Sequence, residues 1–138
     1  LSDGRPFTAT AVDTAGTGSG RITRASCIGD PTPSGFEPTL DQWFDQTAFA
    51  PNAARTYGNC GANTLRGPGS KSMNMSLFRN IRLGGDKRLE LRVETFNLFN
   101  WVNYGFPAAN VGNAGAFGRI TSTLGDPREM QLAVKDYF

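Results

Sequence analysis

Apolar and polar residues alternate in several segments of the C-terminal half of the chain. The segment "RLELRVETF", residues 88–96, puts leucine and valine on one face of an extended strand and arginine and glutamate on the other. The preceding segment "MNMSLFRNIRL", residues 73–83, alternates in a similar way, and "GGDK" between the two segments has the composition of a turn. The pattern predicts an antiparallel β-hairpin around Gly84–Lys87.

A second pair of alternating segments follows. "FGRITSTL" (117–124) and "EMQLAVKDYF" (129–138) flank the turn sequence "GDPR", which predicts another hairpin. The predicted strands are about nine to eleven residues long, whereas strands of soluble proteins usually have about five to six. Tilted strands that cross a bilayer have this greater length. We therefore predict an all-β fold with an antiparallel sheet of four to five strands built from two long hairpins.

The first 70 residues lack such periodicity and are rich in glycine and proline. "PFTATAV", residues 6–12, alternates weakly and is the one strand candidate there. "TLDQWFDQTAF", residues 39–49, is the one helix candidate and is long enough for one or two turns. We expect a loop-rich arm over residues 1–70 and antiparallel hairpins over residues 71–138, both within one domain.

Composition adds little to this picture. The chain has 138 residues, a length that suits one domain, and a formal net charge of +2 without a dense basic block, so we expect no nucleic-acid partner. The chain contains no run of 18 apolar residues, the pattern that would predict a membrane-spanning helix. Because the chain opens on Leu1 instead of methionine, we expect either a processed product or a piece of a longer protein.

The two cysteines, Cys27 and Cys60, lie in loops rich in glycine, asparagine and proline. Their spacing fits no zinc or haem motif, and two thiols alone make a poor metal site. We predict a disulfide between them, with two free thiols as the alternative. A disulfide would stabilise the fold by roughly 3–4 kcal/mol through loop closure and would place the protein in an oxidising compartment.

The sequence gives no support for catalysis, and we predict that the chain is not an enzyme. It has no histidine, and "RGPGSKS" lacks the glycine spacing of a phosphate-binding loop. The carboxylate pair at 41 and 45 fits a solvated turn, and the pair at 90 and 94 fits cross-strand ion pairing. We expect no metal and no cofactor. Calcium is the one ion left open, because four aspartates neighbour turns: Asp3, Asp13, Asp30 and Asp126.

Five aromatic rings follow the first predicted hairpin: Phe96, Phe99, Trp101, Tyr104 and Phe106. The asparagines among them permit turns and cap backbone groups. Rings gathered at the end of a strand are typical of a membrane-interface girdle. A hydrophobic cluster beneath a long loop and a carbohydrate-binding platform are the two other interpretations.

Several segments together resemble one family. "DQWFDQTAFA", "NTLRGPGSKSMNMSLFRNIRL", "LELRVETFNLFNWVNYGFP" and "FGRITSTLGDPREMQLAVKDYF" resemble the C-terminal end of TonB-dependent-receptor-like outer-membrane proteins, of the type with an N-terminal carboxypeptidase-regulatory-like domain. The resemblance spans residues 6–138. It implies the last strands of a large β-barrel that ends in an aromatic assembly signal, here Phe138. Asp136 departs from the apolar residue usual two positions before the end, and no segment of residues 1–138 resembles the family's plug domain.

Four strands cannot close a channel, so a chain of this length leaves open sheet edges that recruit other strands. We therefore expect a non-enzymatic structural subunit, extracellular or on the surface of a Gram-negative bacterium, whose partner is another copy of itself. The expected filament forms by strand donation from Phe7, Thr8, Ala9, Thr10, Ala11 and Val12. The first alternative is a fragment of an outer-membrane nutrient transporter, in which the chain meets the membrane only within a full barrel. The second alternative is a glycan-binding module.

Overall fold

The computed structural model describes residues 4–16 and 23–138 and confirms the all-β fold class. Within these residues the only helical element is a 3-10 turn, η1 (Gln46–Ala48), and no helix is long and apolar enough to span a membrane. The chain divides into two compact units. The sheet unit comprises Ser70–Asn103 and Leu124–Phe138, and the loop unit comprises Tyr104–Thr123 and the described chain up to Gly69.

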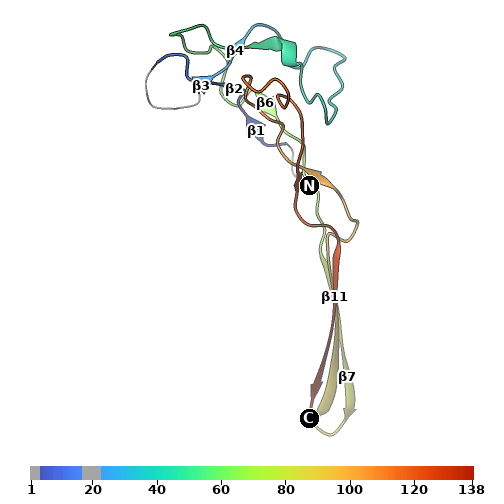
Figure 1. Ribbon diagram of the computed structural model, residues 1–138. Coiled ribbons are helices and arrows are strands. Elements are labelled where there is room, and N and C mark those ends of the chain that lie inside the picture. Colours follow the sequence, from blue (N-terminus) through green and yellow to red (C-terminus); the bar gives the residue numbers. More distant parts are fainter. Residues whose placement is uncertain (1–3, 17–22) are drawn as a thin grey trace. The chain divides into compact units, whose positions relative to one another are not determined.

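The sheet unit contains three long strands: β7 (Met75–Gly84), β8 (Lys87–Phe96) and β11 (Glu129–Tyr137). Their order is β11-β8-β7, so β8 lies in the centre and both its neighbours run antiparallel to it (Figure 1). The β7–β8 hairpin is the predicted one. Gly84 and Gly85 have φ values of +103° and +61° at its turn, a backbone region that glycine enters without steric strain.

The second predicted hairpin does not form. β11 pairs with β8 along its whole length, and residues 117–124 contain only the short strand β10 (Thr123–Leu124). Packing explains the difference. Phe117 and Ile120 are 4% and 9% exposed, because their segment contributes to the core of the loop unit. The long sheet consequently has three strands instead of the expected four to five.

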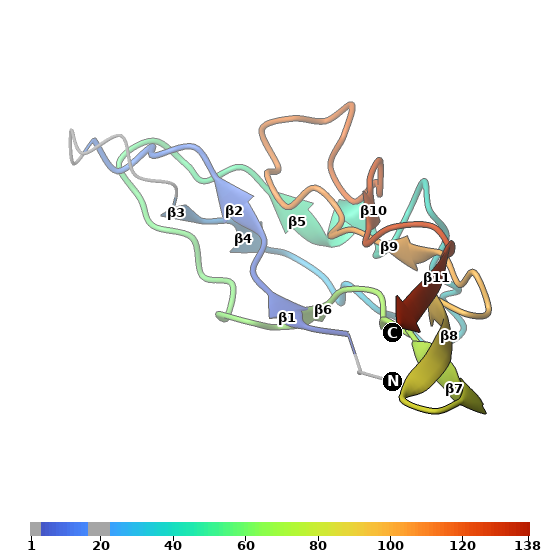
Figure 2. The same ribbon diagram turned by 90° about the horizontal axis from the view of Figure 1, so that it is seen from below.

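The loop unit is held together by short two-residue ladders in place of a continuous sheet (Figure 2). β1 pairs with β6, β2 with β3 and β4 with β5, all antiparallel. The bounds of the short strands are β1 (Pro6–Phe7), β2 (Thr10–Ala11), β3 (Thr23–Arg24), β4 (Ser26–Cys27), β5 (Phe49–Ala50), β6 (Leu65–Arg66) and β9 (Asn103–Tyr104), the last paired with β10.

Aromatic rings form the centre of the loop unit. Phe44 is 1% exposed and contacts Phe49 and Phe117 edge to face, at centroid distances of 5.4 and 5.1 Å. Such pairs contribute roughly 0.5–1.5 kcal/mol each beyond their burial. The predicted helix shrinks to η1, which is capped by Asp45: its carboxylate accepts a hydrogen bond from the Thr47 N–H at 2.9 Å. A ring core of this kind explains how a unit with little regular structure stays folded.

Cys27 and Cys60 form the predicted disulfide, with Cα atoms 5.0 Å apart. Cys60 is 1% exposed, and its N–H donates to the carbonyl of Ala25. The Asn59 side chain forms two hydrogen bonds with the backbone of Cys27: it accepts from the Cys27 N–H at 2.7 Å and donates to the Cys27 carbonyl at 3.3 Å. The disulfide therefore joins two backbone segments that hydrogen bonds already hold side by side.

Candidate functional site

One face of the three-stranded sheet is apolar and exposed. Directly opposed residues of neighbouring strands point to the same face, so the register assigns each side chain to one of the two. The apolar face carries four rungs: Met75, Thr95 and Met130; Leu77, Val93 and Leu132; Arg79, Leu91 and Val134; Ile81, Leu89 and Asp136. Leu132 is 79% exposed and Leu77 is 65% exposed. A contiguous apolar surface of this kind marks contact with protein or membrane.

The opposite face of the same strands is polar. Its rungs are Ser76, Glu94 and Gln131; Phe78, Arg92 and Ala133; Asn80, Glu90 and Lys135; Arg82, Arg88 and Tyr137. Arg92 forms ion pairs with Glu90 at 3.1 Å and Glu94 at 3.6 Å. The Arg88 guanidinium lies 4.2 Å from the centre of the Tyr137 ring. The sheet thus separates an apolar side from a side with charge pairs, which is the arrangement of a barrel wall.

The outer edges of this sheet are open. Among the described residues, no strand pairs with the free edge of β7 or with that of β11. Unpaired N–H and C=O groups along an edge are satisfied in a closed barrel by the neighbouring strands. Within the described residues, both the apolar face and the outer edges of this sheet are therefore uncovered.

Asn97 fastens the end of β8 to two other segments. It has φ of +49°, a left-handed conformation that asparagine tolerates better than most residues, and it is 8% exposed. Its N–H donates to Asn74 Oδ1 at 3.1 Å, before β7. Its side chain accepts from the Trp101 N–H at 3.0 Å and donates to the Trp101 and Asp126 carbonyls at 3.0 and 3.2 Å. Through its N–H and its side-chain amide, Asn97 therefore joins the end of β8 to the segment before β7 and to the main chain of Asp126.

Asn100 and Asn103 extend the same arrangement. Asn100 Oδ1 accepts from the Arg128 N–H at 3.0 Å, immediately before β11. Asn103 pairs with the backbone of Lys71 through both amide atoms, at 2.7 and 2.9 Å, as a neighbouring strand would. We call Asn97, Asn100 and Asn103 the asparagine clamp. The sequence indicates turns and caps at these residues but not their distant partners Asn74, Asp126, Arg128 and Lys71, which are 23 to 32 residues away.

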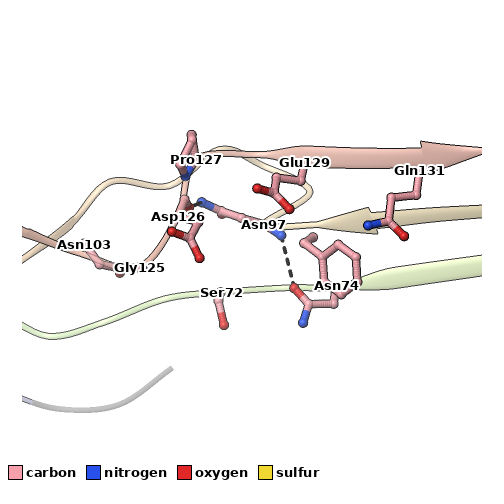
Figure 3. Close-up of a pocket in the computed structure, with 10 residues that line it drawn as sticks. Ser72, Asn74, Asn97, Asn103, Gly125, Asp126, Pro127, Glu129 and Gln131 are labelled. Atoms are coloured by element: carbon pink, nitrogen blue, oxygen red, sulfur yellow. Dashed lines mark hydrogen bonds between the residues drawn. The ribbon is translucent and has the colours of Figure 1, made fainter.

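A cavity of about 390 Å³ lies beside the clamp, at the end of the polar face. Its walls come from the segment before β7, the end of β8 and the start of β11 (Figure 3). Side chains that line it include Ser72, Asn74, Phe96, Asp126, Glu129 and Gln131. The cavity belongs entirely to the sheet unit.

The predicted aromatic cluster is divided between the two units. Phe99 and Trp101 stack at a centroid distance of 4.8 Å in the sheet unit, where Phe96 lines the cavity. Phe106 belongs to the loop unit and contacts Phe7 at 5.8 Å, and Tyr104 belongs to the same unit. The exposed fractions of the five rings lie between 36% and 56%. Three of the five rings therefore belong to the sheet unit and two to the loop unit.

The expected donor segment is occupied within its own chain. Thr10 and Ala11 pair with β3 on one side, and Thr10 exchanges backbone hydrogen bonds with residues 109 and 111 on the other, at 2.7 and 2.8 Å. Ala9 and Ala11 are 0% and 2% exposed. Thr10 is thus paired on both sides within its own chain, and the structure gives filament assembly no support.

The remaining candidate residues stay as predictions. Phe138 is 94% exposed at the end of the chain, and nothing in the structure tests its role as an assembly signal. Asp3, one of the calcium candidates, lies outside the described residues. Across residues 4–16 and 23–138, no three side chains of the metal-ligating types lie together.

Comparison with known proteins decides the family. The family model described as "Outer membrane beta barrel domain" matches residues 1–131. The chain belongs to this outer membrane β-barrel domain family. No curated protein and no solved structure matches it.

Membership of the outer membrane β-barrel domain family accounts for the two faces of the sheet. Strands of such barrels alternate between residues that face lipid and residues that face the lumen. The long β7, β8 and β11 follow this alternation, and the match includes both units of the chain. The outer membrane alternative is thus favoured over the extracellular subunit that the sequence first suggested.

Proposed function

We propose that the chain forms part of the wall of an outer-membrane barrel of the TonB-dependent-receptor-like type, which separates lipid from a polar passage for solutes. The observation that supports this most strongly is the segregation of the faces over four consecutive rungs of one register, in which Arg79 and Asp136 are the charged residues on the apolar face. The apolar face contacts lipid, and the face with Arg92 and its glutamate partners contacts the passage. Neighbouring barrel strands complete the open edges of β7 and β11.

The connections between the strands give the wall a direction. In barrels of this kind short turns face the periplasm and long connections face the outside. The tight turn at Gly84–Lys87 would then be periplasmic. The chain before β7 and the long connection from β8 to β11 both leave the sheet at the opposite end. They supply the loop unit, which the proposal therefore assigns to the extracellular side.

Adjacent residues of β11 provide a matched test of the proposal. Leu132 lies on the apolar face, Gln131 lies on the polar face, and both are exposed. We would introduce Leu132→Arg and Gln131→Arg separately into a barrel that contains this chain together with the neighbouring strands the proposal requires, then measure the urea resistance of that barrel in phospholipid vesicles. An arginine near the middle of the lipid-facing band costs about 2–4 kcal/mol, whereas lumen positions tolerate it. Leu132→Arg should therefore weaken membrane-bound folding roughly 30- to 1,000-fold, and Gln131→Arg should change it little.

Equal behaviour of the two variants in vesicles would contradict the proposal, because it would mean that lipid contacts neither face selectively. Circular dichroism in detergent would first establish that both variants form the sheet. Leu132→Arg adds a charge to an exposed position, so it should not disturb the sheet itself outside the membrane.

A further inference from the structure

The cavity at the end of the polar face offers hydrogen-bonding groups that the protein does not use. Within the described part of the chain, the Asp126 and Glu129 carboxylates, the Gln131 amide and the Ser72 hydroxyl have no hydrogen-bond partner. Asn74 gives only its oxygen to Asn97, which leaves its NH₂ group free. Figure 3 shows these side chains on the same side of the three strands. The cavity thus presents several donors and several acceptors at once.

The mixture of groups limits the chemistry of the ligand. A cation would use the two carboxylates but would leave the NH₂ groups of Asn74 and Gln131 without a role. An anion would face both carboxylates, and none of the residues that line the cavity is a lysine or an arginine. Hydroxyl groups both donate and accept, so a ligand with several hydroxyls can satisfy carboxylates and amides together. The Phe96 ring adds an apolar wall for carbon-bound hydrogens.

We propose that this cavity binds an uncharged polyhydroxylated ligand, a saccharide of one or two rings. Its volume of about 390 Å³ falls within the range of small-molecule pockets, about 300–1,000 Å³. The asparagine clamp supports binding, because Asn97 fixes Trp101 and Asp126 to the end of β8 before any ligand arrives. A preformed wall reduces the entropy lost on binding. The proposal concerns the sheet unit alone and does not depend on contact with a membrane.

Binding can be measured by NMR on the full chain in phosphocholine micelles, since the headgroup of a maltoside detergent would itself compete. Maltose and glucose are the neutral probes, and glucuronate and glucosamine are the charged counterparts of glucose. We expect maltose to shift the side-chain amide signals of Asn74 and Gln131 at concentrations on the order of 10 mM or below. Glucuronate should bind more weakly than glucose, because Asp126 and Glu129 repel its carboxylate.

Two variants test an acceptor group and a donor group of the cavity separately. Glu129→Gln removes a charged acceptor, and Gln131→Leu removes the amide donor. Each should weaken maltose binding about tenfold, the effect expected for loss of one well-placed hydrogen bond. Lys135→Gln is the control, because Lys135 lies on the same face of β11 but does not line the cavity. It should leave the affinity unchanged.

Three outcomes would overturn the saccharide proposal. No shift with any of the probes would mean that the cavity binds none of these sugars. Binding of glucosamine but not of glucose or maltose, insensitive to Gln131→Leu, would indicate a cation site. Binding of maltose that survives both cavity variants would place the sugar elsewhere on the chain. None of these results bears on the vesicle experiment with Leu132→Arg, so failure of one proposal is distinguishable from failure of the other.

Discussion

Loss of the Cys27–Cys60 disulfide should destabilise the loop unit without rearranging it. The backbone around both cysteines is held by other bonds, including those from Asn59 to Cys27 and from Cys60 to Ala25. The folded state therefore changes little when the bond is cut. The main effect falls on the unfolded chain, which regains the freedom of a loop that spans a sequence separation of 33.

The magnitude follows from the length of that loop. In the chain-entropy model, closure of a loop of this size contributes about 3.7 kcal/mol at 25 °C. Urea unfolding of small domains has slopes of about 1–3 kcal/mol per molar. The reduced protein should therefore unfold at roughly 1–4 M less urea than the oxidised protein. A loop unit made of two-residue ladders has little regular structure to offset such a loss.

Tryptophan fluorescence can follow this transition locally. Trp43 lies in the loop unit, where its indole N–H donates to the Arg66 carbonyl at 2.8 Å. Trp101 lies in the sheet unit and uses only its backbone in the asparagine clamp, so Trp101→Phe removes the second signal at small structural cost. Urea titrations of this variant with and without reductant give the difference. The double variant Cys27→Ala, Cys60→Ala should match the reduced protein.

An unchanged midpoint after complete reduction would refute the reasoning. It would mean that the unfolded chain stays compact around the two cysteines and gains no freedom. A large shift in the sheet unit, followed through Trp101 in a Trp43→Phe background, would also contradict it, because both cysteines belong to the loop unit.

Two further substitutions test other contacts. Asn97→Gly should lower the stability of the sheet unit by about 3 kcal/mol through the loss of three side-chain hydrogen bonds. Asn97→Ala should lower it by about 1–2 kcal/mol more, because alanine resists positive φ. Hydrogen exchange of the amides of β8 and β11 measures both, and equal effects would argue against backbone strain. Gly58→Ala should unfold the loop unit, since its Cβ would lie 1.9 Å from the Arg24 carbonyl oxygen. Gly29→Ala should be tolerated, because the closest contact of its Cβ would be at 3.4 Å. Thermal melts compare the two proteins, and similar melting temperatures would contradict the close approach at Gly58.

Local patterns predicted the elements of the sheet better than their pairing. Alternation and the turn at Gly84–Lys87 identified the β7–β8 hairpin, because both signals lie within the hairpin itself. Alternation also identified β11 but assigned it the wrong neighbour. Its true partner, β8, is separated from it by a long connection, and the choice depends on where Phe117 is buried. Periodicity shows that a strand has an apolar and a polar face, but it does not show with which neighbouring strand it pairs.

The cavity and the asparagine clamp could not be predicted from the sequence, because their contacts join distant segments. The sequence indicates that Asn97 is a turn residue among aromatic rings, but its contact residue Asp126 is 29 positions away in the sequence. The disulfide was the one distant contact that the sequence indicated, because only two cysteines exist to pair. The aromatic stretch suggested one surface, whereas its rings are distributed over both units.

The asparagine clamp has a consequence for changes in the connection between β8 and β11. Asn97 and Asn103 recognise main-chain atoms of Trp101, Asp126 and Lys71, so their bonds do not depend on which residues lie between Tyr104 and Thr123. Loop-closure entropy changes by only about 0.6 kcal/mol when a connection doubles in length. Foreign peptides of varied length could therefore be grafted for display at the exposed residues 112–115, with Phe117 kept in the core of the loop unit and with β8 and β11 keeping their register.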